Sequence, residues 1–166
     1  MRVTQALGLG VLLAGCGTAA GRIENGVFHS NKGYQIGLPG NGWRVEANGR
    51  ADLELKRESP PGGMLANATC DGKPLGYSLP MLTRHLTFGL KNRVVVGQEN
   101  EVRNGQSAER TVLRGTMDGM EVGVEAVVLK TERCVHDFLY VAPVAAFESG
   151  RADFRTFVES FAGAAR

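Results

Sequence analysis

Alternating apolar and polar residues predict four consecutive β-strands in the second half of the chain. They cover residues 94–103, 106–117, 120–130 and 133–142. Asn104-Gly105 joins the first two strands, and Asp118-Gly119 joins the second to the third. Both dipeptides favour two-residue hairpin turns, because both central positions of such a turn need a positive φ. The pattern therefore predicts an antiparallel meander.

Shorter strand patterns precede the meander. Two apolar runs in "VFHSNKGYQIGLP" flank residues 31–33 and predict a hairpin, and "NGW" leads into a further strand. In "ADLELKR" (51–57) the leucines point inward and the alternating polar residues, Asp52 included, point outward. "MLANATC" (64–70) predicts another strand. Residues 17–25 contain no apolar period and are predicted to form a linker.

The hydrophobic period changes to that of a helix between Leu75 and Arg93, with Ser78 as a plausible N-cap. One helical face carries four leucines, namely Leu79, Leu82, Leu86 and Leu90. A second apolar stripe consists of Tyr77, Met81, His85 and Phe88. A helix that is apolar on two sides is either sandwiched between other elements or offers a surface to a partner, and both alternatives stay open.

The last strand of the meander, "CVHDFLYVA", is apolar on both faces and predicts cover on both sides. A C-terminal helix, with Ser149 near its start, can supply one cover. Its apolar stripe is Phe147, Phe154, Phe157, Val158 and Phe161. The predicted fold class is therefore α+β, a mostly antiparallel β-sheet with helices on both faces.

This order of elements resembles the PsbP-like family, whose α/β/α sandwich fold is shared by extrinsic photosystem proteins and the Ran-binding Mog proteins. The resemblance rests on "FHSNKGYQIGLPGNGW" (28–43), the mid-chain helix, the "VRNGQSAERTV" hairpin and the closing Phe-rich helix. It covers nearly the whole of residues 26–166, which are predicted to form a single domain. The family implies a non-enzymatic role in docking to, or assembling, a larger complex.

The first fifteen residues are typical of an export signal, with Arg2 followed by a nine-residue apolar run from Ala6 to Ala14. Leu13, Ala14, Gly15 and Cys16 resemble the lipobox of bacterial lipoproteins. The resemblance implies cleavage after Gly15 and acylation of the Cys16 thiol and amino terminus. Residues 1–15 are then a lipoprotein signal peptide, and residues 16–25 are the lipidated N-terminus and tether. The alternative is an ordinary signal peptide, or a misplaced start site, with a chance cysteine.

Two or three acyl chains hold a protein on a membrane effectively permanently. Residue 17 is Gly rather than Asp, which by analogy with enteric lipoproteins indicates the periplasmic face of the outer membrane. The formal net charge of +2 and the lack of a long basic run argue against a nucleic-acid partner.

Cys70 and Cys134 are the two cysteines outside the lipobox. In an oxidising compartment such a pair predicts one disulfide, which by the chain-entropy model stabilises the fold by roughly 4 kcal/mol. Their spacing fits no zinc pattern. Two free buried thiols are the alternative.

Candidate catalytic chemistry is sparse. His29, His85 and His136 lie at no metal-ligand spacing, so no metal or other cofactor is predicted. Adjacent strand residues point to opposite faces, so His136 and Asp137 cannot form a direct acid–base pair. Asp137 shares a face with Val135 and Leu139, and if it is buried it must be hydrogen-bonded or paired, most simply with an arginine such as Arg110 or Arg114. A structural role is favoured over a catalytic one.

Three sequence motifs for chemistry are missing or misleading. "GLPGNG" (37–42) lacks the lysine and following helix of a phosphate loop and predicts a turn. The chain contains neither a G-x-S-x-G nucleophile elbow nor an H-E-x-x-H zinc motif.

Two functional hypotheses follow. The first is a membrane-tethered envelope lipoprotein that acts as a non-enzymatic binding or assembly module for another envelope protein, through the stripe of Tyr77, Met81, His85 and Phe88. The alternative is a small-ligand carrier, or an enzyme whose pocket is assembled from scattered residues. A pocket lined by His136 or Asp137 would favour that alternative.

Overall fold

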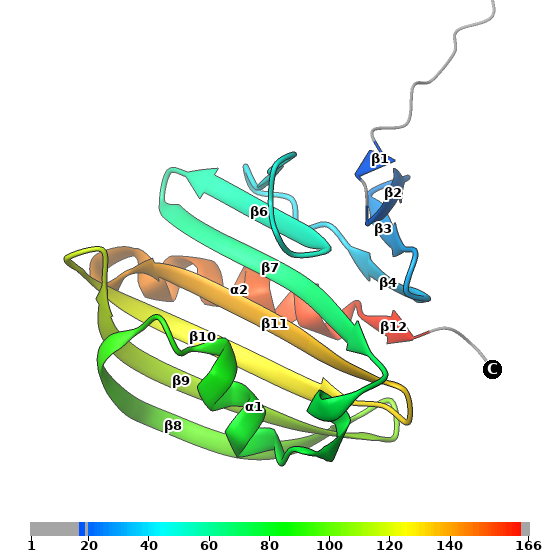
Figure 1. Ribbon diagram of the computed structural model, residues 1–166. Helices are drawn as coiled ribbons and strands as arrows, with labels where there is room; N and C mark the ends of the chain where they lie inside the picture. The colour runs from blue at the N-terminus through cyan, green and yellow to red at the C-terminus, as the bar shows by residue number, and fades with distance from the viewer. Residues whose placement is uncertain (1–16, 19, 164–166) are drawn as a thin grey trace, which may run out of the picture.

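The computed structural model describes residues 17–18 and 20–163, which form two antiparallel sheets and two α-helices (Figure 1). The larger sheet has seven strands in the order β5-β6-β7-β11-β10-β9-β8. Their bounds are β5 Arg44–Val45, β6 Leu53–Glu58, β7 Pro61–Cys70, β8 Lys91–Arg103, β9 Gln106–Met117, β10 Met120–Lys130 and β11 Cys134–Pro143.

The predicted meander is confirmed as β8 to β11. Asn104 and Gly105 have φ of 51° and 76°, and Asp118 and Gly119 have φ of 50° and 82°. Positive φ at both central positions is what a two-residue hairpin needs, which explains why these dipeptides located the turns. β8 begins three residues earlier than the pattern predicts, and it is the edge strand of the sheet.

The smaller sheet has the order β1-β2-β3-β4-β12 and is separate from the larger one. Its strands are β1 Gly17–Thr18, β2 Gly21–Glu24, β3 Val27–Ser30, β4 Tyr34–Gly37 and β12 Ala162–Gly163. The predicted hairpin around residues 31–33 is confirmed as β3 and β4. The predicted linker is wrong for residues 17–18 and 21–24, which form β1 and β2. β1 pairs with β2, and Asn25-Gly26 turns β2 back onto β3.

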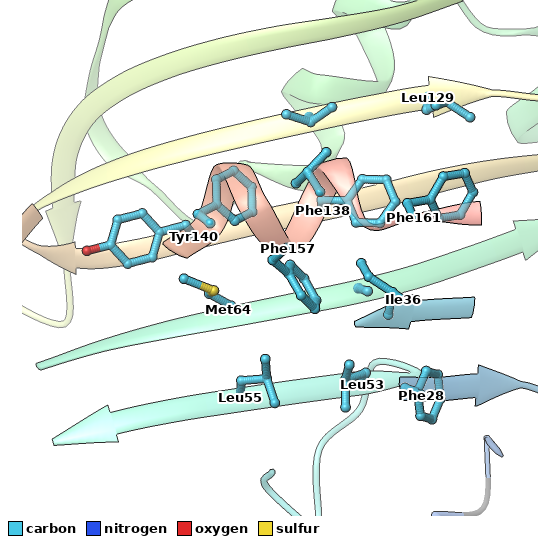
Figure 2. Close-up of a cluster of buried hydrophobic side chains, with 14 of the residues drawn as sticks. Phe28, Ile36, Leu53, Leu55, Met64, Leu129, Phe138, Tyr140, Phe157 and Phe161 are labelled. Atoms are coloured by element: carbon cyan, nitrogen blue, oxygen red, sulfur yellow. The ribbon is translucent and has the colours of Figure 1, made fainter. Parts of the chain in front are cut away.

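Helix α2 (Val144–Glu159) packs on one face of the larger sheet, against β7, β10 and β11. It starts five residues before Ser149, so Ser149 lies in its second turn. All five residues of its predicted apolar stripe, through Phe161 just beyond its end, are buried. Figure 2 shows this core, in which Phe138 and Tyr140 of β11 meet Phe157, Phe161 and the strand residues of both sheets.

A buried ion pair also fixes α2. Arg57 of β6 points inward with the leucines of its strand and is 5% exposed. Its Nη1 lies 2.8 Å from Oδ2 of Asp153, and its guanidinium lies 4.5 Å from the centre of the Trp43 ring. The Trp43 indole also donates to Asp153, at 3.0 Å. The charge of Arg57 is thus neutralised by a carboxylate of α2.

Helix α1 (Leu79–Leu86) is preceded by a 3₁₀ turn, η1 (Lys73–Gly76), and Ser78 is its N-cap residue as predicted. Leu82 packs against Val128 of β10 and Val135 of β11. Val127, the neighbour of Val128, belongs instead to the core under α2. Figure 1 shows α1 in front of the larger sheet and α2 behind it.

We predict that Gly150→Ala destabilises the fold. A β-carbon at Gly150 would lie 2.4 Å from Oη of Tyr140, whose hydroxyl already donates to the carbonyl of Phe147 at 2.9 Å. Overpacking of this kind costs about 1–3 kcal/mol. Urea unfolding should show this loss, whereas Gly76→Ala, where a β-carbon meets nothing within 4 Å, should leave the midpoint unchanged. Equal midpoints for the two variants would contradict the packing described.

Candidate functional site

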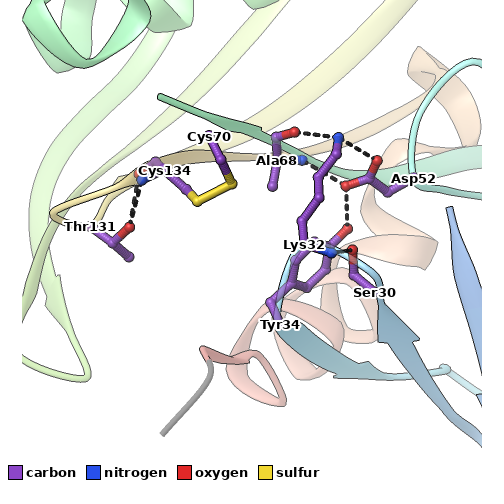
Figure 3. The surroundings of a disulfide bond; sticks show 8 residues. All are labelled: Ser30, Lys32, Tyr34, Asp52, Ala68, Cys70, Thr131 and Cys134. Carbon is purple, nitrogen blue, oxygen red and sulfur yellow. Dashed lines mark hydrogen bonds and ion pairs between the residues drawn. A yellow bond between two sulfur atoms is a disulfide. The ribbon is translucent and has the colours of Figure 1, made fainter. Parts of the chain in front are cut away.

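Cys70 and Cys134 form a disulfide in the structure, and their two residues are directly paired between β7 and β11 (Figure 3). Their Cα atoms are 4.0 Å apart. The alternative of two free thiols is therefore not what the structure shows. The bridge closes a loop of 64 residues, which contains α1 and the first three strands of the meander.

A buried carboxylate lies beside the disulfide. Asp52 is 5% exposed, so the prediction that it points outward is wrong. Its oxygens accept from Lys32 Nζ at 2.7 Å, the Tyr34 hydroxyl at 3.1 Å and the Ala68 amide at 3.0 Å (Figure 3). Asp52 lies in the bend before β6, where strand alternation does not set the direction of a side chain. The cluster joins the small sheet to the large one.

His136 extends this polar cluster. Its ring lies 5.4 Å from that of Tyr34 and 4.8 Å from that of Phe161. Burial lowers the pKa of His136 to about 4, outweighing the opposite effect of Asp52. Its Nδ1 atom is buried without a hydrogen-bond partner in the described part of the chain. At neutral pH the ring is therefore an uncharged imidazole packed between aromatic rings.

A cavity of about 650 Å³ opens next to His136 and the disulfide. Side chains of Lys32, Asn104, Gln106 and Arg133 also line it. The ammonium of Lys32 donates to Asp52 and, at 2.5 Å, to the Ala68 carbonyl. It therefore takes part in the contact between the two sheets. The cavity can hold a small polar molecule by hydrogen bonds, but its lining residues present no paired nucleophile and base.

Asp137 is only half-buried and lies on the other face of β11 from His136. No hydrogen bond or ion pair joins it to Arg110 or Arg114, so the expected pairing is wrong. Arg110 instead donates to Glu101, at 2.5 Å, and to the fully buried Glu125. Arg110 shares a face with Glu125, and both point away from Asp137. Burial without a partner raises the pKa of Asp137 to about 6.

The second apolar stripe of the mid-chain helix is exposed rather than sandwiched. We call it the α1 surface; it consists of Tyr77, Met81, His85 and Phe88. The exposed fractions are 37% for Tyr77, 44% for Met81 and 86% for Phe88. The leucines of the opposite stripe pack toward the sheet, and Thr83 donates to Glu109 of β9, so the α1 surface stays in solvent.

Hydrogen bonds hold both ends of the α1 surface. Lys130 donates to the carbonyls of Leu75 and Tyr77, at 2.6 and 2.9 Å. The rings of Tyr77 and His85 meet edge to face at 5.7 Å. At the other end Arg93 of β8 donates to Thr87 Oγ1, at 3.0 Å. The exposed side chains therefore stand on a fixed backbone.

An apolar groove of about 680 Å³ lies on the larger sheet where no helix covers it. Its apolar lining includes Leu65, Met117, Met120, Leu139 and Val141. Met120 is 58% exposed. Neither the groove nor the Asp52 cluster was predicted from the sequence, because both depend on which strands become neighbours.

Other expected features can be placed briefly. Among the described residues no group of His, Cys, Asp and Glu could hold a metal ion. Residues 41 and 42 form a turn within "GLPGNG", with positive φ at both positions. No helix of the described residues is long and apolar enough to cross a membrane. Cys16 lies outside the described residues.

Comparison with known proteins shows the fold. No protein-family model matches the chain, and neither does any curated protein. The solution structure of cyanobacterial PsbP (CyanoP) from Synechocystis sp. PCC 6803 is similar with a TM-score of 0.59 and 16% identity, over 91% of this chain and 98% of that one. The chain therefore has a PsbP-like, mostly antiparallel α+β fold.

Two further structures share this fold. LpqN, a protein involved in cell envelope biogenesis of Mycobacterium tuberculosis, has a TM-score of 0.60 and 15% identity, over 82% of this chain and 87% of that one. A Bacteroides thetaiotaomicron protein has a TM-score of 0.60 and 7% identity, over 87% of this chain and 50% of that one. At these identities the likeness concerns the fold alone.

We predict opposite pH dependences from His136 and Asp137. Between pH 6.5 and about 4 the unfolded chain binds a proton at His136 that the folded chain does not, so this group lowers stability as the pH falls. Between pH 3.8 and about 6 the folded chain binds a proton at Asp137 that the unfolded chain does not, so that group lowers stability as the pH rises. The full effect is about 3 kcal/mol for His136, and less for the partly exposed Asp137.

Urea unfolding from pH 4.5 to 7 separates the two groups. The stability of Asp137→Asn should rise more steeply with pH than that of the parent chain. The stability of His136→Gln, measured relative to the parent chain, should fall as the pH rises. Two variants whose stability curves run parallel to the parent curve would show that neither side chain is buried as described.

Proposed function

We propose that this chain is a membrane-tethered envelope lipoprotein whose domain is a non-enzymatic binding or assembly module for another envelope protein. In this proposal the domain is an α/β/α sandwich of the PsbP-like kind. Cleavage follows Gly15, and lipid on Cys16 anchors the chain at the periplasmic face of the outer membrane. The lipobox residues support the anchor, and LpqN, described as involved in cell envelope biogenesis, shares the fold.

The exposure of the α1 surface is the observation on which the proposed protein partner rests. An aromatic side chain that buries its ring gains about 1.5–3 kcal/mol, so Phe88 at 86% exposure forgoes most of that gain in the free protein. Contiguous exposed apolar side chains on a fixed backbone are typical of interaction sites. A partner that covers Phe88, Met81 and Tyr77 would recover this free energy with little ordering cost.

The position of the α1 surface supports the same proposal. In Figure 1 the small sheet with β1, the first described strand, lies at the upper right, while α1 and β8 lie at the lower side of the view. A chain held at its N-terminal end would thus present α1 away from the anchored end, where a second envelope protein can reach it.

The cavity beside His136 favours a second candidate, a carrier of a small polar ligand. His136 lines that cavity, together with the amides of Asn104 and Gln106. Native mass spectrometry of the chain purified from its host would detect a bound molecule. A ligand lost on His136→Phe or Gln106→Leu would favour the carrier over the binding module.

The anchor predicts a specific amino terminus. Mass spectrometry should find a chain that begins at Cys16 and carries a diacylglyceryl thioether, in the membrane fraction. Cys16→Ser should remain uncleaved and unlipidated, while Cys70→Ala, with its lipobox intact, should still be processed. An unmodified, uncleaved terminus in the cytosol of the parent strain would refute the anchor.

The α1 surface predicts a crosslink. A photo-crosslinking amino acid placed at Phe88 of the full chain, in intact envelopes, should capture a discrete protein. The same group at Glu148 of α2, whose side chain is 77% exposed, should not capture it. Capture from both positions, or from neither, would contradict a partner at the α1 surface.

A further inference from the structure

The strongest unassigned feature is the distribution of charge around α1. Residues 72–98 contain no Asp or Glu, although the chain has 17 of them. The same segment carries four basic residues, namely Lys73, Arg84, Lys91 and Arg93, all exposed. It covers η1, α1 and the first half of β8. In a chain of net charge +2 this is a local excess of positive charge.

Exposed apolar side chains concentrate in the same segment. Of the nine large apolar side chains that are exposed in the described structure, six lie between residues 72 and 98. These are Tyr77, Met81, Phe88, Val94, Val95 and Val96. The three valines lie on edge strand β8, where the pairing with β9 is irregular between Val95 and Gly97. We call these six residues with His85 the α1–β8 surface.

Contacts join the two halves of this surface. Arg93 of β8 donates to Thr87 Oγ1 at 3.0 Å and to the carbonyl of Arg84 at 3.4 Å. Asp137 of β11 and Glu109 of β9 both lie opposite Val128, on the face of the sheet that α1 packs against, and Asp137 is half-buried. Glu109 is 1% exposed and accepts from Thr83 at 2.9 Å. Its carboxylate is therefore shielded from a partner. The next acidic residue along β8 is Glu99, which lies 3.4 Å from Arg110.

We infer that the α1–β8 surface binds a protein segment that is both acidic and apolar. This inference specifies the chemistry of the partner, and it rests on the proposed function. Apolar side chains of the segment cover Phe88, Met81 and the β8 valines, and its carboxylates lie over Arg84 and Lys91. Charge complementarity of this kind selects partners and speeds encounter, and apolar contact supplies affinity. An anionic membrane offers the same two chemistries, but in Figure 1 α1 lies at the opposite side of the molecule from β1, the described strand nearest the proposed anchor.

Selection from a displayed library of random twelve-residue peptides tests the inference. The full chain carrying Cys16→Ser is immobilised, and binders are counter-selected against the same chain carrying Phe88→Ser. We expect the remaining peptides to have an excess of acidic over basic residues and apolar residues between them. Their affinity should fall about tenfold on Arg84→Glu with Lys91→Glu, and also on raising NaCl from 50 to 300 mM.

A control variant tests whether the effect depends on where the charge is changed. Arg44→Glu changes an equally exposed arginine on β5 and should leave peptide affinity unchanged. Peptides without an acidic excess, or no peptide that depends on Phe88, would overturn the inference. Co-sedimentation with phosphatidylglycerol vesicles that depends on both Phe88 and Arg84 would overturn it as well, in favour of a lipid surface.

This result is distinct from that of the crosslinking experiment. A partner captured at Phe88 in envelopes whose crosslinked segment is neutral or basic would leave the binding module standing and refute its acidic partner. Failure to capture any protein there would remove the proposed function itself.

Discussion

The larger sheet has more apolar face than its helices can cover, and this mismatch shapes the rest of the molecule. Seven strands spaced about 4.8 Å apart span roughly 30 Å, whereas an eight-residue helix is only about 12 Å long. α2, with sixteen residues, and the small sheet bury the aromatic core on one face. α1 buries only Leu82 and its neighbours on β10 and β11. The apolar groove and the α1–β8 surface are what this unequal cover leaves in solvent.

Polar contacts reinforce the junctions that the apolar core forms between the small sheet, α2 and the larger sheet. Asp52 accepts hydrogen bonds from Lys32 and Tyr34 of the small-sheet hairpin and from Ala68 of β7. Asp153 ties α2 to Arg57 and Trp43 in the same way. Each is an ion pair with one buried member, Asp52 or Arg57, so loss of the partner would leave a buried charge uncompensated. The charged groups of the Asp52 and Asp153 clusters are therefore engaged in contacts between elements of the fold.

The same division underlies the proposal of a binding module. Asp52 is paired within its cluster and His136 is uncharged at neutral pH, whereas burial without a partner raises the pKa of the half-buried Asp137. The groups left for interaction are apolar side chains and unpaired basic ones on α1 and β8. A fixed, exposed and positively charged apolar surface is suited to recognise another protein.

Local sequence determined the elements of this protein. Turn dipeptides with positive φ located three strands of the meander, and the phenylalanine stripe of α2 identified a helix that is buried on one side. The turns and the helix stripe depend on residues near one another in sequence, or on a period that one element carries by itself. The cysteine pairing was predicted from the number of cysteines and an expected oxidising compartment, and the structure contains the disulfide.

Tertiary structure alone decided how the elements combine and what stays exposed. The pattern of residues 21–24 was too short and polar to indicate β2, which exists because β3 pairs with it. Asp52 was assigned to the wrong face, and Asp137 to the wrong partner, because the direction of one side chain and the position of Arg110 depend on strands far apart in sequence. Whether the stripe of Tyr77, Met81, His85 and Phe88 is covered could not be read from α1 either. A stripe is buried only if another element reaches it, and the sequence of a helix does not contain the positions of its neighbours.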